Sequence, residues 1–294
     1  MLTLATASSS LPQGRDGAAT QRRSVQPGRA AIVALYEELA LHPKPGLVSF
    51  IDSGSHRDMH ASTFLRSLFA LRGYFRQAAD LGAAGVAFEP LEALGIAAEA
   101  RMLRATGGIN THRGAVFTLG LLCASAGALD AAGVDRTTVA LRRTLLASWG
   151  QSLTERAKRV RDSNGSRAAR QHGLRAAGDE AALGFPTLFE HVLPALRNAR
   201  AAGADERRAR LQALFAAMGT LDDTNLVHRG GIEGLRFAQA AARAYLADGG
   251  ALHPQGFARA RTLHRAFIAR RLSPGGAADL LAAACWLDRV CGSP

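Results

Sequence analysis

Apolar residues recur at three- and four-residue spacing along most of this chain, which is the period of a helix with one buried face. The first such stretch runs through Ile32, Leu35 and Leu39. Pro43 and Pro45 predict the end of that helix, because each proline removes a backbone donor and biases the preceding residue away from helical angles.

The same period continues through the rest of the chain and predicts further helices. Their approximate ranges are 60–81, 91–105, 115–129, 136–159, 187–201, 205–218, 232–247, 254–271 and 276–290. No stretch alternates apolar and polar residues convincingly in the manner of a strand. We therefore expect an all-α fold, a single-domain helical bundle in which polar, glycine-containing loops form the active site.

The predicted helix at 115–129 is apolar on every side (AVFTLGLLCASAGAL). A helix without a polar face belongs in the centre of a bundle. Gly120 and Gly127 would allow neighbouring helices to approach its backbone closely. The run is shorter than the ~20 residues that a bilayer requires, so it indicates a soluble protein with no membrane partner.

Two stretches lack helical periodicity. Residues 1–27 mix Ser, Gln, Gly, Pro and Arg, which predicts a disordered N-terminal tail ahead of one helical catalytic domain at 28–294. Residues 160–178 are basic and poor in apolar side chains, which predicts a mobile surface loop.

Composition and charge limit the class of protein. A hydrophobic content of 48% is enough for a large core. The formal charge of +12 fits a polyanionic partner, a phosphate-rich small molecule or a compositional bias toward arginine, since the only lysines are Lys44 and Lys158. The three cysteines form no CxxC pair and the N-terminus has no signal-peptide pattern, which indicates a reduced, cytoplasmic protein.

Polar residues concentrate in four segments between the predicted helices, at 42–60, 107–114, 184–190 and 219–231. Glycines let backbone amides turn toward an anion, and the Lys and Arg residues beside them supply positive charge. The helix that follows Gly114 adds the partial positive charge of its N-terminus. Asp, Asn and Thr supply the oxygen ligands that Mg²⁺ accepts. Together the segments predict a metal-nucleotide site.

Each of these residues also has a simpler interpretation. Asp58 could cap the helix that begins near His60, Asp222 or Asp223 could be a turn or cap residue, and Lys44 could only solvate a turn.

The histidines are weak metal candidates. His56 and His60 are four residues apart, but a zinc-protease motif needs Glu after the first His, and this chain has Arg57 there. Three other histidines lie in arginine-rich or amphipathic surroundings, which predicts exposure to solvent: His172, His253 and His264.

The four segments, in this order, resemble the triphosphoribosyl-dephospho-coenzyme A synthase family. The matching words are HPKPGLVSFIDSGSHRDM, GGINTHRGAVF, GFPTLFEHVLPAL and DDTNLVHRGG, with SPGGAADLLAA at 273–283 as a fifth. The resemblance extends from about residue 30 to 290, and the first word is closer to the malonate decarboxylase branch. This chain departs from the family at Arg113, where Lys is frequent, and at Ser49, where Asp is frequent. Arg113 keeps the positive charge, whereas Ser49 removes a carboxylate that Asp52 could replace.

The resemblance implies a reaction and its partners. The triphosphoribosyl group of ATP would be joined to the 2′-hydroxyl of 3′-dephospho-CoA with release of adenine. The product would pass to a transferase that loads the acyl-carrier subunit of malonate decarboxylase. ATP and 3′-dephospho-CoA are then the substrates, Mg²⁺ the metal, and a homo-oligomer is possible.

The reaction suggests roles for individual residues. Adenine departure leaves an oxocarbenium-like sugar, near which we expect Asp58 as the carboxylate and His56 or His112 as the group that transfers a proton. We expect Mg²⁺ at Asp222 and Asp223. The expected substrate-binding residues are Lys44, Gly46, Gly107, Gly108, Asn110, Thr111, Arg113, Gly114, Asn225 and Arg229. The 184–190 segment would form a wall through Phe185 and Pro186.

Two rival functions remain open at the level of sequence. A helical, Mg²⁺-dependent hydrolase of ADP-ribose linkages would also suit the Asp222–Asp223 pair, with water in place of the 2′-hydroxyl. A basic nucleic-acid-binding protein would suit the charge, but the arginines at 142–175 have no aromatic residues among them and no helix-turn-helix word is clear. We therefore expect no nucleic-acid partner.

Overall fold

The computed structural model describes residues 25–159 and 171–291. Helices connected by loops make up these two ranges, and no β-strand occurs in them, which confirms the all-α prediction. The elements are α2 (Pro27–Ala40), α3 (Ala61–Leu71), α4 (Tyr74–Ala83), α5 (Phe88–Thr106), α6 (Arg113–Ala131), α7 (Thr138–Lys158), α9 (Ala177–Ala182), the π-helical turn η1 (Thr187–Val192), α10 (Leu193–Ala201), α11 (Glu206–Thr220), α12 (Thr224–Ala247), the 3₁₀ turn η2 (Gly250–Leu252), α13 (Gly256–Ala269) and α14 (Gly275–Cys291).

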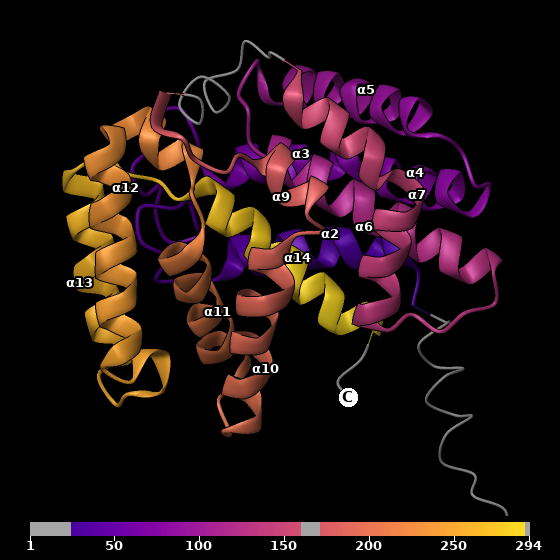
Figure 1. Ribbon diagram of the computed structural model, residues 1–294. Coiled ribbons are helices and arrows are strands. Elements are labelled where there is room, and N and C mark those ends of the chain that lie inside the picture. The colour runs from indigo at the N-terminus through magenta and orange to yellow at the C-terminus, as the bar shows by residue number, and fades with distance from the viewer. Residues whose placement is uncertain (1–24, 160–170, 292–294) are drawn as a thin grey trace, which may run out of the picture.

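Helix α14 crosses the middle of the bundle. In Figure 1 it runs between α12 and α13 on one side and α4, α6 and α7 on the other. It packs against α2, α11 and α6. Trp286 is fully buried on this helix, and its indole N–H donates to the carbonyl of Pro27 at 2.9 Å. The last helix of the chain is therefore a central one, and its start lies among loops from distant parts of the sequence.

Helix α6 is the second central element, as its all-round apolar sequence predicts. A Cβ atom at Gly120 would overlap the Tyr74 hydroxyl, and one at Gly127 would overlap the carbonyl of Ala79. Both contacts are on α4, so the glycines set how closely α4 and α6 approach. By length and composition α6 could cross a membrane, but 72% of its apolar window is buried inside the protein, as in a core helix.

Several helix boundaries differ from the prediction. The expected helix 60–81 is two helices, α3 and α4, because the chain turns at Gly73, a residue that favours helix breaks. The helix expected at 232 begins eight residues earlier at Thr224 and kinks at Gly231, whose φ of 65° is outside the helical region. The expected helix 187–201 starts as the π-helical turn η1.

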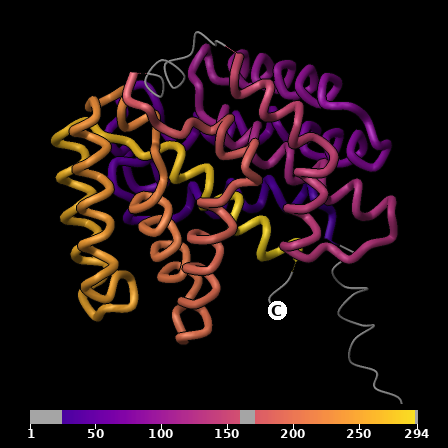
Figure 2. The backbone as a smooth tube through the Cα atoms, viewed as in Figure 1, coloured from indigo at the N-terminus to yellow at the C-terminus, as the bar shows by residue number. Residues whose placement is uncertain are grey.

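The backbone trace in Figure 2 shows α12 and α13 side by side at one end of the molecule. At the beginning of the described chain, Val25 already packs against the core and α2 starts at Pro27. Residues 1–24 of the predicted tail lie outside the described residues, as do residues 160–170 of the predicted loop. The end of that loop is partly helical, because α9 begins at Ala177.

Candidate active site

Three of the four polar segments meet at the N-terminal end of α14, in residues 272–279, which we call the α14 junction. From segment 42–60, the hydroxyl of Ser55 donates to the Leu272 carbonyl at 2.6 Å. From segment 219–231, Asp223 accepts the backbone N–H of Ala277 at 3.0 Å. From segment 107–114, Gly114 lies directly against the Asp279 carboxylate. The fifth matching word, SPGGAADLLAA, is thus where the other segments come together.

Glycine is required where segment 42–60 folds onto this junction. Gly46 has φ 67° and Gly54 has φ 54°, both in the left-handed region. A Cβ atom at Gly46 would overlap the Leu272 carbonyl, and one at Gly54 would lie 2.5 Å from the Gly46 carbonyl. These glycines fix the loop's path, which gives Gly46 a structural reason besides the predicted substrate contact.

His264 also holds this segment, which corrects the prediction that it faces solvent. It is 5% exposed. Its Nδ1 lies 2.6 Å from the Lys44 carbonyl, and its Nε2 lies 3.1 Å from both oxygens of Asp52. The polar face of α13 is covered by segment 42–60 at this point, and local periodicity carries no information about such a long-range contact.

Lys44 is buried rather than solvating a turn, so that simpler interpretation is wrong. The side chain is 1% exposed, and its ammonium donates to the carboxylate of Glu38 at 2.5 Å and to the Glu38 carbonyl at 2.7 Å. Burial lowers the pKa of Lys44, while the charge of Glu38 opposes the shift. Glu38 lies on α2, the helix before the segment, and no local pattern in the sequence distinguishes it.

His112 is buried with one ring nitrogen unused. Its Nδ1 lies 2.6 Å from the Ser67 hydroxyl, and the ring meets Phe64 edge-on. Its Nε2 has no hydrogen-bond partner, and neither has the buried hydroxyl of Thr111. Burial, assisted by the charge of Lys44, lowers the pKa of His112 to about 3. The ring is therefore neutral near pH 7, with Nε2 available to a bound molecule.

Asp279 is a functional candidate that local sequence patterns do not reveal. Burial of its carboxyl group raises its pKa well above the usual value, and the negative charges of Glu38 and Asp223 act in the same direction. A hydrogen bond from the backbone of Ala115 opposes the shift. The residue as a whole is only partly buried, although its carboxyl group is desolvated.

These contacts join five side chains into one group, which we call the buried charge cluster: Glu38, Lys44, His112, Asp223 and Asp279. Each member is in contact with, or electrostatically coupled to, another member. The cluster has three carboxyl groups and one ammonium group, so it holds more potential negative than positive charge. Such a cluster favours a cationic centre beside it.

The predicted metal residues have separate partners. Asp223 caps α12 by accepting the N–H of Asn225 at 3.0 Å and also accepts from Ala277, which confirms the cap interpretation. Asp222 accepts the N–H of Arg175 at 3.1 Å and lies 3.5 Å from the Gln239 amide. Among residues 25–159 and 171–291, no group of three or more His, Cys, Asp or Glu side chains is arranged to hold a metal ion.

The predicted phosphate loop is largely occupied by its own contacts. Gly107 and Gly108 have φ of 70° and 87°, and both N–H groups donate to the Leu103 carbonyl to end α5. The Asn110 side chain accepts the backbone N–H of Arg113 at 3.2 Å. The exposed Arg113 guanidinium lies 3.0 Å from Glu99. In this arrangement the Arg113 side chain is the part of the loop best placed to meet an anion.

A second, more exposed group lies beside the junction, and we call it the rim: His56, Asp58 and Arg229. His56 Nε2 lies 2.9 Å from the Ser273 hydroxyl, and its Nδ1 lies 3.8 Å from Asp58. Burial, with the charge of Arg229, lowers the pKa of His56 to about 4. Asp58 is 62% exposed and does not cap α3, whose N-cap is His60.

Two backbone carbonyls hold Arg229 in place at the rim. Its guanidinium donates to the Ser55 carbonyl at 2.6 Å and to the Arg271 carbonyl at 2.8 Å. Asn225, one helical turn earlier on α12, lies exposed beside Gly275. Segment 219–231 therefore contacts the junction at Gly275 through Asn225, and it contacts Arg271, just before the junction, through Arg229.

The zinc alternative has no geometric support among the described residues. His60 Nδ1 lies 2.7 Å from the Ser53 hydroxyl, whereas His56 is directed to Ser273. The two rings therefore have different partners.

The 184–190 segment is held by a buried carboxylate. Glu180 accepts the backbone N–H of Thr187 at 3.1 Å and its hydroxyl at 2.9 Å. Arg175 lies 3.2 Å from the same Glu180 and bonds Asp222 through its backbone. Phe185 is buried at φ 53°. The segment is linked to the 219–231 segment through Arg175, and Glu190 lines a pocket together with Gly219 and Thr220.

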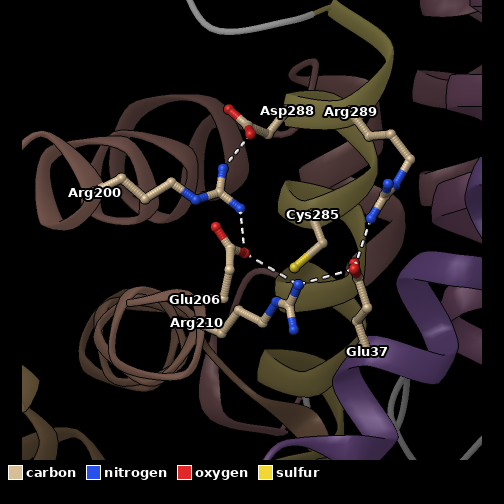
Figure 3. A pocket seen from close by; sticks show the side chains of 7 residues that line it. All are labelled: Glu37, Arg200, Glu206, Arg210, Cys285, Asp288 and Arg289. Atoms are coloured by element: carbon tan, nitrogen blue, oxygen red, sulfur yellow. Dashed lines mark hydrogen bonds and ion pairs between the residues drawn. The ribbon is translucent and has the colours of Figure 1, made fainter. Parts of the chain in front are cut away.

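A cavity of about 500 Å³ lies away from the predicted site residues. It is lined by Glu37, Arg200, Glu206, Arg210, Cys285, Asp288 and Arg289 (Figure 3). Each of its arginines is paired with a carboxylate. Because the lining charges balance, the cavity offers no net attraction for a polyphosphate, and the α14 junction remains the candidate site.

Known proteins similar to this chain agree on one family. Residues 24–293 match the family described as ATP:dephospho-CoA triphosphoribosyl transferase. A relative from Stutzerimonas stutzeri, named "Probable 2-(5''-triphosphoribosyl)-3'-dephosphocoenzyme-A synthase", is 44% identical over 88% of this chain and 90% of its own length. Relatives of the same name from Azotobacter vinelandii and Acinetobacter calcoaceticus are 42% and 38% identical, each over 88% of this chain and 89% of their own length.

No solved structure matches the chain. The family match spans every segment of the α14 junction and nearly the whole described chain. The chain is therefore an enzyme that belongs to the ATP:dephospho-CoA triphosphoribosyl transferase family.

Proposed function

We propose that this enzyme joins the triphosphoribosyl group of ATP to 3′-dephospho-CoA and releases adenine. The bond between C1′ of ATP and N9 of adenine breaks, and a bond forms between C1′ and the 2′-oxygen of dephospho-CoA. The product is 2′-(5″-triphosphoribosyl)-3′-dephospho-CoA. Family membership gives the class of reaction, and the buried charge cluster at the α14 junction is the observation that supports this site for it.

The cluster suits the sugar chemistry because cleavage of the C1′–N9 bond develops positive charge on the ribose. Carboxylates in a largely desolvated site stabilise such charge far more than carboxylates in water. Glu38 and Asp279 lie on two helices that meet at the junction, and the neutral His112 offers its unused Nε2 for a hydrogen bond to a substrate. We place the ribose of ATP beside this cluster.

The phosphates belong at the exposed side of the same region. Arg113 and Arg229 carry positive charge there, and the Arg113–Glu99 pair is 48% and 30% exposed, so little energy opposes its exchange for a phosphate. The remaining predicted contacts are kept in the proposal as substrate-binding residues: Gly46, Asn110, Thr111, Gly114 and Asn225. Lys44 is buried, so it would act on the phosphates through its charge.

Any Mg²⁺ in the reaction would enter the site bound to the triphosphate. Asp223 uses its carboxylate to cap two helices, so the Asp222–Asp223 pair does not fit a shared ion in this arrangement. Asp222 is less buried than Asp223 and is the more accessible of the two carboxylates. If the triphosphate needs Mg²⁺ for charge neutralisation, EDTA will abolish turnover and added Mg²⁺ will restore it. Full turnover in EDTA would remove the ion from the proposal.

We also propose a downstream use for the product. The product would serve a transferase that loads the acyl carrier of malonate decarboxylase, and both proteins would act in the cytoplasm. The curated relatives are named for the synthase reaction alone. Transfer of the product onto a malonate decarboxylase carrier, but not onto a citrate lyase carrier, would support this branch.

The direct test is incubation of the folded protein with ATP, Mg²⁺ and 3′-dephospho-CoA, followed by mass detection of the joined product. The transferase makes that product. The rival ADP-ribose hydrolase would instead cleave an ADP-ribosyl linkage with water and show no need for dephospho-CoA. The nucleic-acid-binding rival would show salt-dependent DNA binding that is stronger than ATP binding.

A further inference from the structure

We propose that Asp279 is the proton-transferring carboxyl group of the reaction: it gives a proton to the departing adenine and then accepts the proton of the attacking 2′-hydroxyl. This inference rests on the proposed function and adds to it a catalytic residue. It replaces Asp58, His56 and His112 in the proton-transfer role.

The first observation that supports this role is the position of Asp279. It lies just after the first turn of α14, and its carboxylate fills the space that a Cβ atom at Gly114 would need. It also accepts a hydrogen bond from the backbone of Ala115 at the start of α6. Asp279 therefore bridges the junction and segment 107–114, and the residue as a whole is only partly buried.

The surroundings of Asp279 favour a carboxyl group that holds a proton. Glu38 on α2 and Asp223 ahead of α12 face it with negative charge. The one ammonium group in the cluster, that of Lys44, is already bonded to Glu38 at 2.5 Å. A protonated carboxyl group beside two carboxylates is a general acid in the same sense as a raised glycosidase carboxyl group.

An unused polar atom in the same buried charge cluster points to a ligand. His112 is 3% exposed, yet its Nε2 has no partner, and Thr111 has a buried hydroxyl without one. His112 is two residues before Gly114, against which Asp279 packs, and it is coupled to Lys44 in the same cluster. A buried ring nitrogen left unpaired costs free energy, and a bound substrate would supply the missing partner.

The other candidates are less suited to proton donation. The pKa values of His112 and His56 lie at about 3 and about 4, so both rings are neutral near pH 7 and have no proton surplus to give. Asp58 is 62% exposed, and a carboxylate in water lacks the desolvated setting of Asp279. Glu38 holds Lys44, and Asp223 caps two helices.

The step balances without another reactant. As the C1′–N9 bond breaks, its electron pair leaves with adenine and the Asp279 proton moves to an adenine ring nitrogen, so adenine departs neutral. The Asp279 carboxylate then faces the positive sugar. The 2′-oxygen of dephospho-CoA bonds to C1′, and its proton passes to the carboxylate, which restores the starting acid.

The test compares Asp279→Asn and Asp279→Glu with the wild-type enzyme, and Asp80→Asn on the exposed face of α4 is the matched control. Asp279→Asn keeps the shape and ATP binding but loses about 10²–10⁴-fold in kcat, the usual contribution of a positioned acid. Asp279→Glu retains a carboxyl group. If Asp279→Asn fails to fold, Asp279→Glu is the variant that is compared with the wild-type enzyme. Asp80→Asn matches wild type.

Two readouts separate proton transfer from a structural role. Wild-type kcat should fall as pH rises through the pKa of Asp279 in the complex, because the protonated form is needed, and this limb should move in Asp279→Glu and vanish in Asp279→Asn. With nicotinamide riboside triphosphate, whose base leaves without taking a proton, the deficit of Asp279→Asn should shrink at least tenfold.

Other results would overturn the assignment. A folded Asp279→Asn enzyme with wild-type kcat would remove Asp279 from the chemistry. An equal deficit with both donors, or an unchanged alkaline limb in Asp279→Glu, would leave Asp279 only a structural role. Absence of joined product with the wild-type enzyme would instead refute the proposed function, so the two failures are distinguishable.

Discussion

At the residue scale, the raised pKa of Asp279 lowers the stability of the folded protein near neutral pH. Its pKa is raised in the folded protein because its carboxyl group is desolvated beside Glu38 and Asp223. The folded state therefore holds this proton to higher pH than the unfolded state. Above the ordinary carboxyl range near 4, the unfolded chain releases the proton first, so the stability contributed by Asp279 falls as pH rises toward its folded pKa.

Replacing Asp279 with Asn should therefore stabilise the protein at neutral pH while it reduces catalysis. We expect the melting temperature to rise at pH 7, by about 2–4 °C for each kcal/mol gained in a protein near this size. At about pH 3 the difference from wild type should be small, because Asp279 is then mostly protonated in both states. Thermal unfolding at the two pH values measures this. A variant less stable than wild type at pH 7 would contradict the buried-acid description.

The Lys44–Glu38 pair should behave as a buried ion pair. Lys44→Met leaves the Glu38 carboxylate buried without its partner, and we expect a loss of about 3–5 kcal/mol in the free energy of unfolding. Adding Glu38→Gln removes the unpaired charge and should restore most of that loss without restoring turnover. Urea unfolding of the single and double variants gives the comparison. Equal stability of wild type and Lys44→Met would mean that the pair is not buried in solution.

At the element scale, Asp223 joins the starts of two helices. It caps α12 through Asn225 and holds the first turn of α14 through Ala277. Both helix N-termini carry partial positive charge, and a carboxylate between them satisfies donors that would otherwise be unpaired. The predicted metal residue thus has a structural role in the described fold, because it fixes the helix on which Asp279 lies.

Asp223→Ala should lower both stability and turnover. Each lost cap costs about 0.5–2 kcal/mol, and α14 should lose its fixed position at the junction. The matched control is Thr137→Ala, which removes the N-cap of α7 by deleting its bond to Ala140. That variant should lose similar stability per cap but keep its kcat. If Asp223→Ala kept wild-type kcat after correction for the folded fraction, the junction would not depend on this cap.

The helices were predictable from sequence because their buried faces repeat locally. The 115–129 run was correctly placed at the centre, since apolarity on all sides leaves no face for water. Asp279 was not predictable in this way. An Asp near the start of a helix is ordinary in sequence, and nothing local reveals that its carboxyl group meets Gly114 across the molecule.

Other parts of the candidate site show the same limit. The four polar segments could be identified as loops, and three of them do meet. The roles of individual residues are harder to predict from sequence, because they depend on long-range packing. Examples are the burial of Lys44, the contact of His264 with Asp52 and the capping by Asp223. Gly107 and Gly108 were expected to bind phosphate, yet their positive φ values already explain them as the end of α5.

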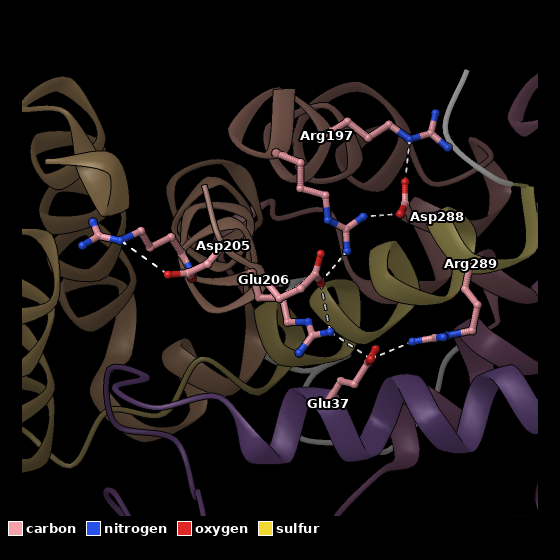
Figure 4. A network of polar contacts seen from close by, with 9 residues as sticks. Glu37, Arg197, Asp205, Glu206, Asp288 and Arg289 are labelled. Carbon is pink, nitrogen blue, oxygen red and sulfur yellow. Dashed lines mark hydrogen bonds and ion pairs between the residues drawn. The ribbon is translucent and has the colours of Figure 1, made fainter. Parts of the chain in front are cut away.

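For the whole molecule, ion pairs account for part of the high arginine content. Arginines and carboxylates on α2, α10, α11 and α14 form one connected network (Figure 4). Glu37 belongs to this network, and its neighbour Glu38 belongs to the buried charge cluster. The network thus fixes the two helices, α2 and α14, that carry Glu38 and Asp279, which links the stability of the bundle to the geometry of the site.

The central claim is transfer of a triphosphoribosyl group to dephospho-CoA, and the most direct measurement is the stoichiometry of the wild-type reaction. Adenine and the joined product should appear in a one-to-one ratio, and omission of dephospho-CoA should abolish both. Adenine release at the same rate without dephospho-CoA, with free ribose triphosphate as the product, would show a hydrolase and contradict the account.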